Sequence, residues 1–167
     1  MKRIFALLLL YAAPSFSAPL PAVRLDGIVD NRTLHMRYEK ATFICRPYGI
    51  RTFEELLLDT QTVGECRRVI ERFKKEHPIE AEFAAYHLEV MQFYPLETKN
   101  ETCLLYTNGR VSYSEALLKE GLAVISKRLD DDVWRFRFER AETGARKAKL
   151  GLWSDPEWKV CAEALRE

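Results

Sequence analysis

Four cysteines are the residues whose chemistry is most evident in the sequence: Cys45, Cys66, Cys103 and Cys161. None of them belongs to a C-x-x-C pair, the spacing typical of zinc sites and redox motifs. In an oxidising compartment such cysteines form disulfides. We therefore expect two bridges, for which four cysteines allow three connectivities.

The histidines offer no comparable chemistry. His35, His77 and His87 are scattered along the chain, and their spacing does not converge on a metal ion. His35 alternates with apolar neighbours, as a residue on the outer face of a strand does. The sequence contains neither a Gly-rich phosphate loop nor a G-x-S-x-G elbow.

The N-terminus has the three-part layout of a secretory signal peptide. A basic pair is followed by an apolar run over residues 4–13, and the small residues Ser15 and Ser17 suit a signal peptidase. The sequence therefore predicts a signal peptide at residues 1–17, a mature chain that begins at Ala18, and export to the periplasm or the extracellular space. The apolar run is too short to span a bilayer, and no later run is long enough. An uncleaved N-terminal anchor is the alternative.

The charge balance argues against a general phosphate-binding surface. The chain has 26 basic and 25 acidic residues, and loss of residues 1–17 would remove Lys2 and Arg3, which leaves a net charge of about −1. A near-neutral chain weakens the case for nucleic-acid binding. About 150 residues remain, enough for one domain with one sizeable core.

The first two thirds of the chain read mainly as short strands. Alternating or apolar runs predict five strands, at residues 23–25, 33–38, 42–45, 88–93 and 102–107. An Asn-Gly turn follows the last of them. Apolar residues at helical spacing predict one inserted helix over residues 65–75, which Pro78 ends.

Helical patterns follow the strands. They are expected at residues 114–118, at residues 133–150 and from Pro156 onward. Strands and helices without a βαβ rhythm are typical of an α+β protein. Five short strands with an inserted helix fit a five-stranded OB-type β-barrel followed by C-terminal helices.

Two stretches of the sequence resemble the thermonuclease (staphylococcal-nuclease-like) family. The first is similar to that family's block of an arginine, apolar residues, aspartate, threonine, proline and glutamate, and reads Arg46-Pro47-Tyr48-Gly49-Ile50-Arg51-Thr52-Phe53-Glu54. The second begins at Tyr106-Thr107-Asn108-Gly109-Arg110, continues through residues 115–123 and ends at Gly151-Leu152-Trp153. Asp30-Asn31-Arg32-Thr33-Leu34 also falls where the family has Asp-Gly-Asp-Thr and an apolar residue.

The resemblance implies how the chain is divided. It predicts a staphylococcal-nuclease-like domain at residues 22–154 and a C-terminal helical extension at residues 155–167. In this barrel type the third and fifth strands are adjacent, which implies a bridge between Cys45 and Cys103. Cys66 and Cys161 would then join the inserted helix to the last helix.

The resemblance also implies what an active site would need. In an active family member two aspartates hold calcium, a glutamate acts on the attacking water, and two arginines grip the phosphate. Arg46 falls on the first arginine and Glu54 on the glutamate, so these two are the catalytic candidates if any activity remains.

The metal ligands of the family are replaced. Arg32 and Arg51 stand at the places of the two aspartates, which reverses the charge of a cation site. Asn100 falls near the second arginine, and a neutral amide cannot supply its charge. Asp26 and Asp30 do not restore the ligand pair. We therefore expect no calcium, no other cofactor and a pseudoenzyme.

Several functions are compatible with this altered site. Arg32, Arg46 and Arg51 could form a cationic pocket for a phosphate, a carboxylate or an acidic partner, without a metal. An arginine could instead replace the role of the cation while Glu54 handles water, as in a metal-independent phosphodiesterase acting on DNA or RNA. A third possibility is an interaction domain of an envelope assembly. A closed cluster in which Glu54 or Asp30 pairs with the arginines would bind nothing.

Aromatic residues on the two later strands raise one more possibility. Phe93, Tyr94 and Tyr106 could form a stacking platform for single-stranded nucleic acid, as in many OB-type barrels. The competing expectation is core packing, because a small barrel needs its inward positions filled.

Overall fold

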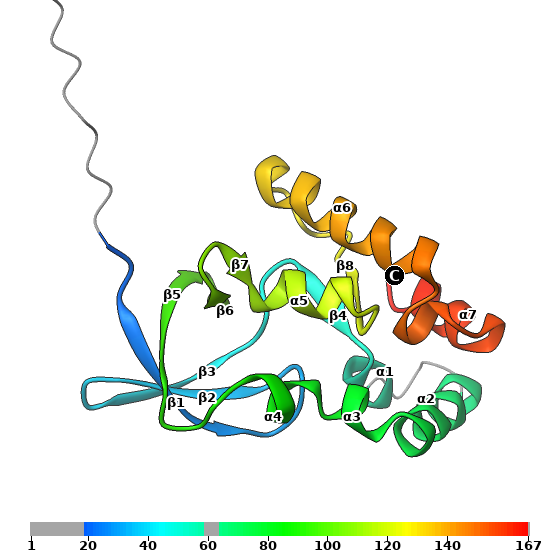
Figure 1. The fold of residues 1–167 in the computed structure, drawn as a ribbon, viewed down its shortest axis with the longest axis horizontal. Helices are drawn as coiled ribbons and strands as arrows, with labels where there is room; N and C mark the ends of the chain where they lie inside the picture. The colour runs from blue at the N-terminus through cyan, green and yellow to red at the C-terminus, as the bar shows by residue number, and fades with distance from the viewer. Residues whose placement is uncertain (1–18, 59–63, 167) are drawn as a thin grey trace, which may run out of the picture.

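The computed structural model describes residues 19–58 and 64–166. The signal peptide predicted at residues 1–17 lies outside the described residues. The main sheet lies at one end of the molecule and most of the helices lie at the other, with the short strands β4 and β8 among them, as Figure 1 shows. In the described part of the chain no helix is long and apolar enough to cross a membrane.

The first three predicted strands are confirmed, and together they form a meander. It consists of β1 (Ala22–Ile28), β2 (Leu34–Tyr38) and β3 (Ala41–Cys45), paired antiparallel in sequence order. Leu25 lies opposite Met36, and both side chains are fully buried. Alternate residues therefore face the core, as the period of two predicts.

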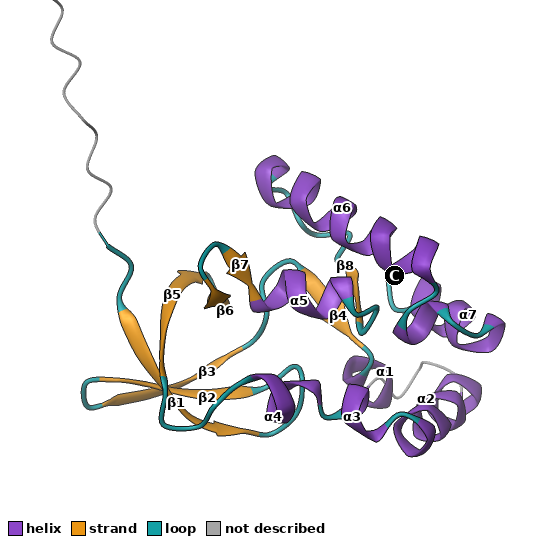
Figure 2. Cartoon of the chain, in the orientation of Figure 1, coloured by secondary structure: helices purple, strands orange, loops and turns teal. Residues whose placement is uncertain are grey.

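The later strands extend this sheet into an open barrel. After β1 come β5 (Phe93–Lys99), β6 (Thr102–Asn108) and β7 (Val111–Ser112), in the order β3-β2-β1-β5-β6-β7. The two ends of the sheet meet only at Pro47 and Cys103, as far as the described residues show. The α+β class and the OB-like arrangement are confirmed, although the barrel does not close (Figure 2).

The strand predicted at residues 88–93 is wrong. Leu88 follows helix α4 (Phe83–His87), and Met91 has a left-handed φ of 73°. The backbone N–H of Gln92 donates to the carbonyl of Glu89, which closes a turn before β5 begins. Apolar residues alternate in this stretch although it forms a turn. The alternation alone cannot distinguish such a turn from a strand.

The insertion between the strands is larger than predicted. Strand β4 (Ile50–Thr52) leads into α1 (Glu54–Leu58), α2 (Gly64–Glu76), α3 (Pro78–Ala81) and α4. The predicted helix at 65–75 is α2, and Pro78 begins α3 instead of only ending a helix. Proline suits that position because its missing N–H would have no helical partner there.

The C-terminal helices form as expected. They are α5 (Tyr113–Lys119), α6 (Asp132–Ala148) and α7 (Pro156–Ala164), with the short strand β8 (Ala123–Ile125) after α5 and the 3-10 turn η1 (Gly151–Trp153) before α7. Ser112 and Glu115 form a capping box at the start of α5. Strand β8 pairs antiparallel with β4, outside the main sheet.

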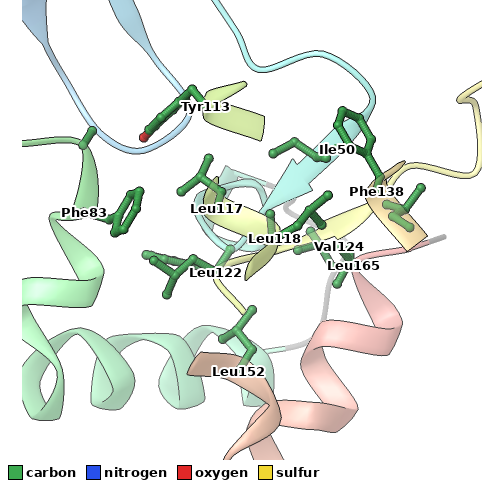
Figure 3. Packing of buried hydrophobic residues seen from close by; sticks show 14 of the residues in the cluster. Ile50, Phe83, Tyr113, Leu117, Leu118, Leu122, Val124, Phe138, Leu152 and Leu165 are labelled. Atoms are coloured by element: carbon green, nitrogen blue, oxygen red, sulfur yellow. The ribbon is translucent and has the colours of Figure 1, made fainter. Parts of the chain in front are cut away.

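Two glycines allow the Gly-Leu-Trp segment after the long helix to pack closely against the end of α5. Gly121 has a φ of 71°, and a Cβ there would lie 2.2 Å from the carbonyl oxygen of Leu150. Gly151 has a φ of 51° and would likewise collide with the carbonyl of Glu120. Only glycine allows these two backbones to approach so closely. Leu152 then enters the core that α5, β8, α6 and α7 share (Figure 3).

Both predicted disulfides are confirmed. Cys45 joins Cys103, and Cys66 joins Cys161, each with 5.5 Å between the Cα atoms. The first bridge lies where the open barrel comes nearest to closing. The second ties α7 to α2, where Phe73 also contacts Trp158 with 5.1 Å between ring centroids.

Loss of the second bridge is expected to destabilise the fold strongly. It spans 95 residues, and the chain-entropy model assigns about 4–5 kcal/mol to a loop of that size. Cys66→Ala/Cys161→Ala should therefore lower the midpoint of urea unfolding under oxidising conditions. The same variant should respond less than the wild type to a reducing agent. An unchanged midpoint would contradict the pairing.

Candidate functional site

The carboxylate of Asp30 holds the loop between β1 and β2 in place. Asp30 Oδ1 accepts hydrogen bonds from the backbone N–H groups of Arg32 (2.9 Å) and Thr33 (2.7 Å). This turn is typical of aspartate, whose short side chain reaches the backbone two or three residues later. One Asp30 oxygen is therefore already engaged by the loop.

Asn31 is the fully buried centre of the site. Its side-chain amide donates to the carbonyl of Ala81 (3.0 Å) and accepts from the N–H of Ala84 (2.8 Å), which anchors α3 and α4. Its backbone carbonyl accepts from the hydroxyl of Tyr113 (3.1 Å), and its N–H donates to Glu54 Oε1 (3.3 Å). One residue thus joins the loop to four helices, α1, α3, α4 and α5.

Glu54, the predicted general base, is almost completely enclosed. It begins α1 with only 4% of its surface exposed, and its Oε2 is buried without a hydrogen-bond partner in the described residues. Burial raises the pKa of this carboxyl to about 7. The nearby Thr52 hydroxyl lowers the pKa, although its geometry falls short of a hydrogen bond, and the charge of Asp30 raises it.

Glu55, which the sequence did not single out, holds Arg32 and Arg51, the two arginines predicted to stand at the places of the metal ligands. Its Oε2 lies 2.9 Å from Arg51 Nε, and its Oε1 lies 3.6 Å from Arg32 Nε. The structure therefore brings Arg32 and Arg51 together across one carboxylate. The spacing of four residues between Arg51 and Glu55 was a local signal for half of this arrangement.

The remaining candidates lie at different distances from this cluster. Arg46 follows β3, its carbonyl accepts from the N–H of Cys103 (2.8 Å), and its buried Nε has no partner in the described residues. Asn100 forms the β5–β6 turn with a φ of 54° and lines a hollow of about 550 Å³ beside Tyr48. Asp26 pairs instead with Arg24 and Arg37, which lower the pKa of its carboxyl.

A second, cation-lined hollow of about 280 Å³ opens beside Arg51 and Glu55. Besides Ile50 and Ser126 it is lined by three further cations: Lys127, Arg128 and Arg166. Arg166 is engaged by Glu142 and Glu163, whereas Lys127 and Arg128 form no ion pair with the described residues. We call this space the Arg51 hollow.

The cations of the Arg51 hollow were missed by sequence reasoning for a simple reason. Lys127 and Arg128 are adjacent, so the pair was visible, but nothing local places it opposite Arg51. Arg166 lies 115 positions after Arg51 and gives no sequence signal at all.

The donor set does not fit calcium. Calcium requires six to eight oxygen ligands, mostly carboxylates. Arg32 and Arg51, which the resemblance places where the family has its two calcium-binding aspartates, carry guanidinium groups, and both lie beside Glu55. Within residues 19–58 and 64–166, no cluster of three acidic, histidine or cysteine side chains could hold a metal.

The three aromatic candidates have separate environments. Phe93 is 59% exposed, but Tyr94 is buried and its hydroxyl accepts from the N–H of Glu89 (2.8 Å). Tyr106 is partly buried, and its ring centroid lies 6.4 Å from that of Trp134. Tyr94 and Tyr106 therefore pack against the core, and of the three only Phe93 is exposed enough to stack on a base.

The buried carboxyl of Glu54 makes stability depend on pH. Because folding raises its pKa from 4.5 to about 7, the folded state binds the proton more tightly, and stability falls as the pH rises through this window. Glu54→Gln should remove this loss, which is on the order of 3 kcal/mol. The melting temperature of the variant should exceed that of the wild type by a margin that grows from pH 5 to pH 8. The exposed Glu139→Gln is the control and should show no such trend.

Asn31 should be sensitive even to an isosteric change. Asn31→Asp keeps an acceptor for Ala84 N–H but cannot donate to the carbonyl of Ala81 at neutral pH. A buried acceptor left without its donor costs about 1–3 kcal/mol, and the added charge costs more. Urea unfolding should show Asn31→Asp to be less stable than Asn100→Asp, which changes an exposed turn. Equal stabilities would show that the hydrogen bonds of Asn31 do not hold the helices.

Comparison with known proteins gives one finding. The family model described as staphylococcal nuclease homologue matches residues 85–155, from α4 to the start of α7. A search of curated proteins found no match to the chain. The matched segment contains the Asn-Gly turn, the capped helix α5 and the Gly-Leu-Trp ending on which the predicted resemblance rested. This segment of the chain therefore matches the staphylococcal-nuclease-like family, which supports the resemblance predicted from the sequence.

Proposed function

We propose that this chain is an exported thermonuclease-like binding module that has lost calcium-dependent nuclease activity and binds an anionic group without a metal. The observation that carries the proposal is the Arg51 hollow, in which four cations face a single carboxylate. Two of these cations, Lys127 and Arg128, have no ion-pair partner in the described residues. Guanidinium and ammonium groups together suit a phosphate or a carboxylate.

The environment of Glu54 argues against catalysis. A general base must come within hydrogen-bond reach of the water that it deprotonates. Glu54 is enclosed, with one oxygen bonded to Asn31 and the other covered by the protein. Its neighbour Glu55 is more accessible, but two arginines hold it.

The anion would compete with Glu55 for Arg51. Arg51 is about 30% exposed in its side chain and touches Glu55 on one side and the hollow on the other. Arg32 shares Glu55 from outside the hollow and would keep that carboxylate balanced if Arg51 turned toward a ligand. Arg46, the third arginine predicted to bind the anion, does not line the hollow in the described residues. Ligands of this chemistry include single-stranded nucleic acid and an acidic envelope protein.

The two disulfides support the exported location. Disulfides persist in the periplasm and outside the cell, whereas cytosolic thiols are kept reduced. Both bridges join elements that are far apart in sequence, so the fold depends on an oxidising compartment. This agrees with the signal peptide that the N-terminus predicts.

One observation favours a second candidate, a metal-independent phosphodiesterase. The pKa of Glu54 is raised to about 7, which is close to the value that suits a general base at neutral pH. A guanidinium would then stabilise the phosphate charge in place of the cation. This candidate requires α1 to move so that Glu54 reaches solvent.

Anion binding is tested with the mature protein, a labelled single-stranded DNA 12-mer and inorganic phosphate as competitor. Lys127→Gln/Arg128→Gln should weaken binding about tenfold or more, because it removes two charge-assisted contacts. Chelator should leave binding unchanged. The control is Lys74→Gln/Lys75→Gln, which changes the same charge on an exposed face of α2. Equal loss in both variants would show general charge attraction and contradict the pocket.

A cleavage assay separates the two candidates. The mature protein is incubated with single-stranded DNA and RNA, in calcium or in chelator, beside Glu54→Gln. The binding module predicts no cleavage in any condition. Cleavage that survives chelator and disappears in Glu54→Gln would establish the phosphodiesterase, and cleavage that requires calcium would contradict both.

A further inference from the structure

A groove of about 460 Å³ runs between α5 and α6, on a part of the surface that shares no lining residue with the Arg51 hollow. We call it the α5–α6 groove. Its lining comes from these two helices alone: Glu115, Lys119, Arg137, Arg140, Ala141, Gly144 and Ala145. The function proposed above makes no use of it.

The floor of the groove is formed by the smallest residues, Ala141, Gly144 and Ala145, none of which has a side chain longer than a methyl group. Ala141 and Ala145 are buried, and Gly144 lies between them on the exposed side of α6. A Cβ added at Gly144 would meet nothing within 4 Å. Glycine inside a helix is less stable than alanine, and the packing of this chain does not require it here. The glycine therefore keeps the floor low, so that another backbone can approach.

The rims of the groove carry unbalanced positive charge. Arg137 pairs with Glu115, with 2.6 Å between Arg137 Nη2 and Glu115 Oε2. The guanidinium of Arg137 also stacks on the ring of Trp134. Lys119 and Arg140 are exposed and form no ion pair with the described residues. The two cations stand on opposite helices, so the space between them attracts negative charge.

An apolar surface continues the groove along α6. Phe136 is 62% exposed and Val133 is 70% exposed. Phe136, Arg140 and Gly144 follow each other at intervals of four residues, so they form one stripe on the helix. A ligand that lies along α6 could therefore contact Phe136 one helical turn away from Arg140.

We propose that the α5–α6 groove binds an acidic segment of a partner protein. Charge complementarity selects the occupant: carboxylates would pair with Lys119 and Arg140 while the main chain passes over Gly144. An apolar side chain of the same segment would pack on Phe136 and Val133. A polynucleotide would find the two cations but would gain nothing from the low floor that Gly144 maintains.

The test uses a fluorescent 12-residue peptide of alternating Glu and Leu, with a Lys-Leu peptide as the probe control, and measures anisotropy. Gly144→Gln fills the floor without changing the charge and should reduce affinity at least tenfold while the melting temperature rises. Thr143→Gln, at an exposed neighbour outside the groove, should leave affinity unchanged. Lys119→Glu/Arg140→Glu should abolish binding and favour the Lys-Leu peptide.

Three outcomes would overturn the proposal. Affinity that is unaffected by Gly144→Gln would show that the groove is not occupied. Competition by the single-stranded DNA 12-mer, with loss of peptide binding in Lys127→Gln/Arg128→Gln, would move the site to the Arg51 hollow. Self-association in sedimentation that Gly144→Gln abolishes would make a second copy the occupant. If the Arg51 hollow does not bind single-stranded DNA, the peptide results still stand. The two proposals are therefore tested separately.

Discussion

The hydrogen bonds of Asn31 are the constraint on which the site depends. This fully buried residue is bonded through its side chain to α3 and α4 and through its backbone to Tyr113 and Glu54. A buried polar group without a partner is costly, so each of these bonds fixes the position of the element that supplies the other half. The β1–β2 loop, α1 and α5 therefore keep one arrangement, although they are distant in sequence.

Two consecutive glutamates receive opposite environments from this arrangement. Neighbouring residues on a helix point about 100° apart, so Glu54 enters the core beneath Asn31 while Glu55 remains at the surface. Desolvation favours the protonated form of the first. The second stays beside Arg32 and Arg51. Two guanidinium groups thus share one carboxylate, which leaves a net positive charge at the surface.

The C-terminal part of the chain completes the cation-lined surface. Glu142 is buried in α6, accepts from the N–H of Ile125 (3.1 Å) and also binds Arg166. It therefore holds both β8, which leads into Lys127 and Arg128, and the end of α7. Arg166, two residues after the end of α7, lies outside the segment that matches the nuclease family, yet it lines the Arg51 hollow. The second disulfide fixes this helix to α2.

The sequence by itself determined what depends on near neighbours: the first three strands, the helix that contains residues 114–118, and the Gly-Leu-Trp ending. It also carried the resemblance to the staphylococcal-nuclease-like family, which implied both disulfides. It misplaced the strand before β5, because the turn at Met91 mimics strand alternation. Only the tertiary structure decided that Glu55 holds both arginines and that Arg166 joins them. The spacing of Arg51 and Glu55 is a local signal, but Arg32 and Arg166 are too far from them in sequence to leave one. These two arginines arrive only when burial brings the elements together.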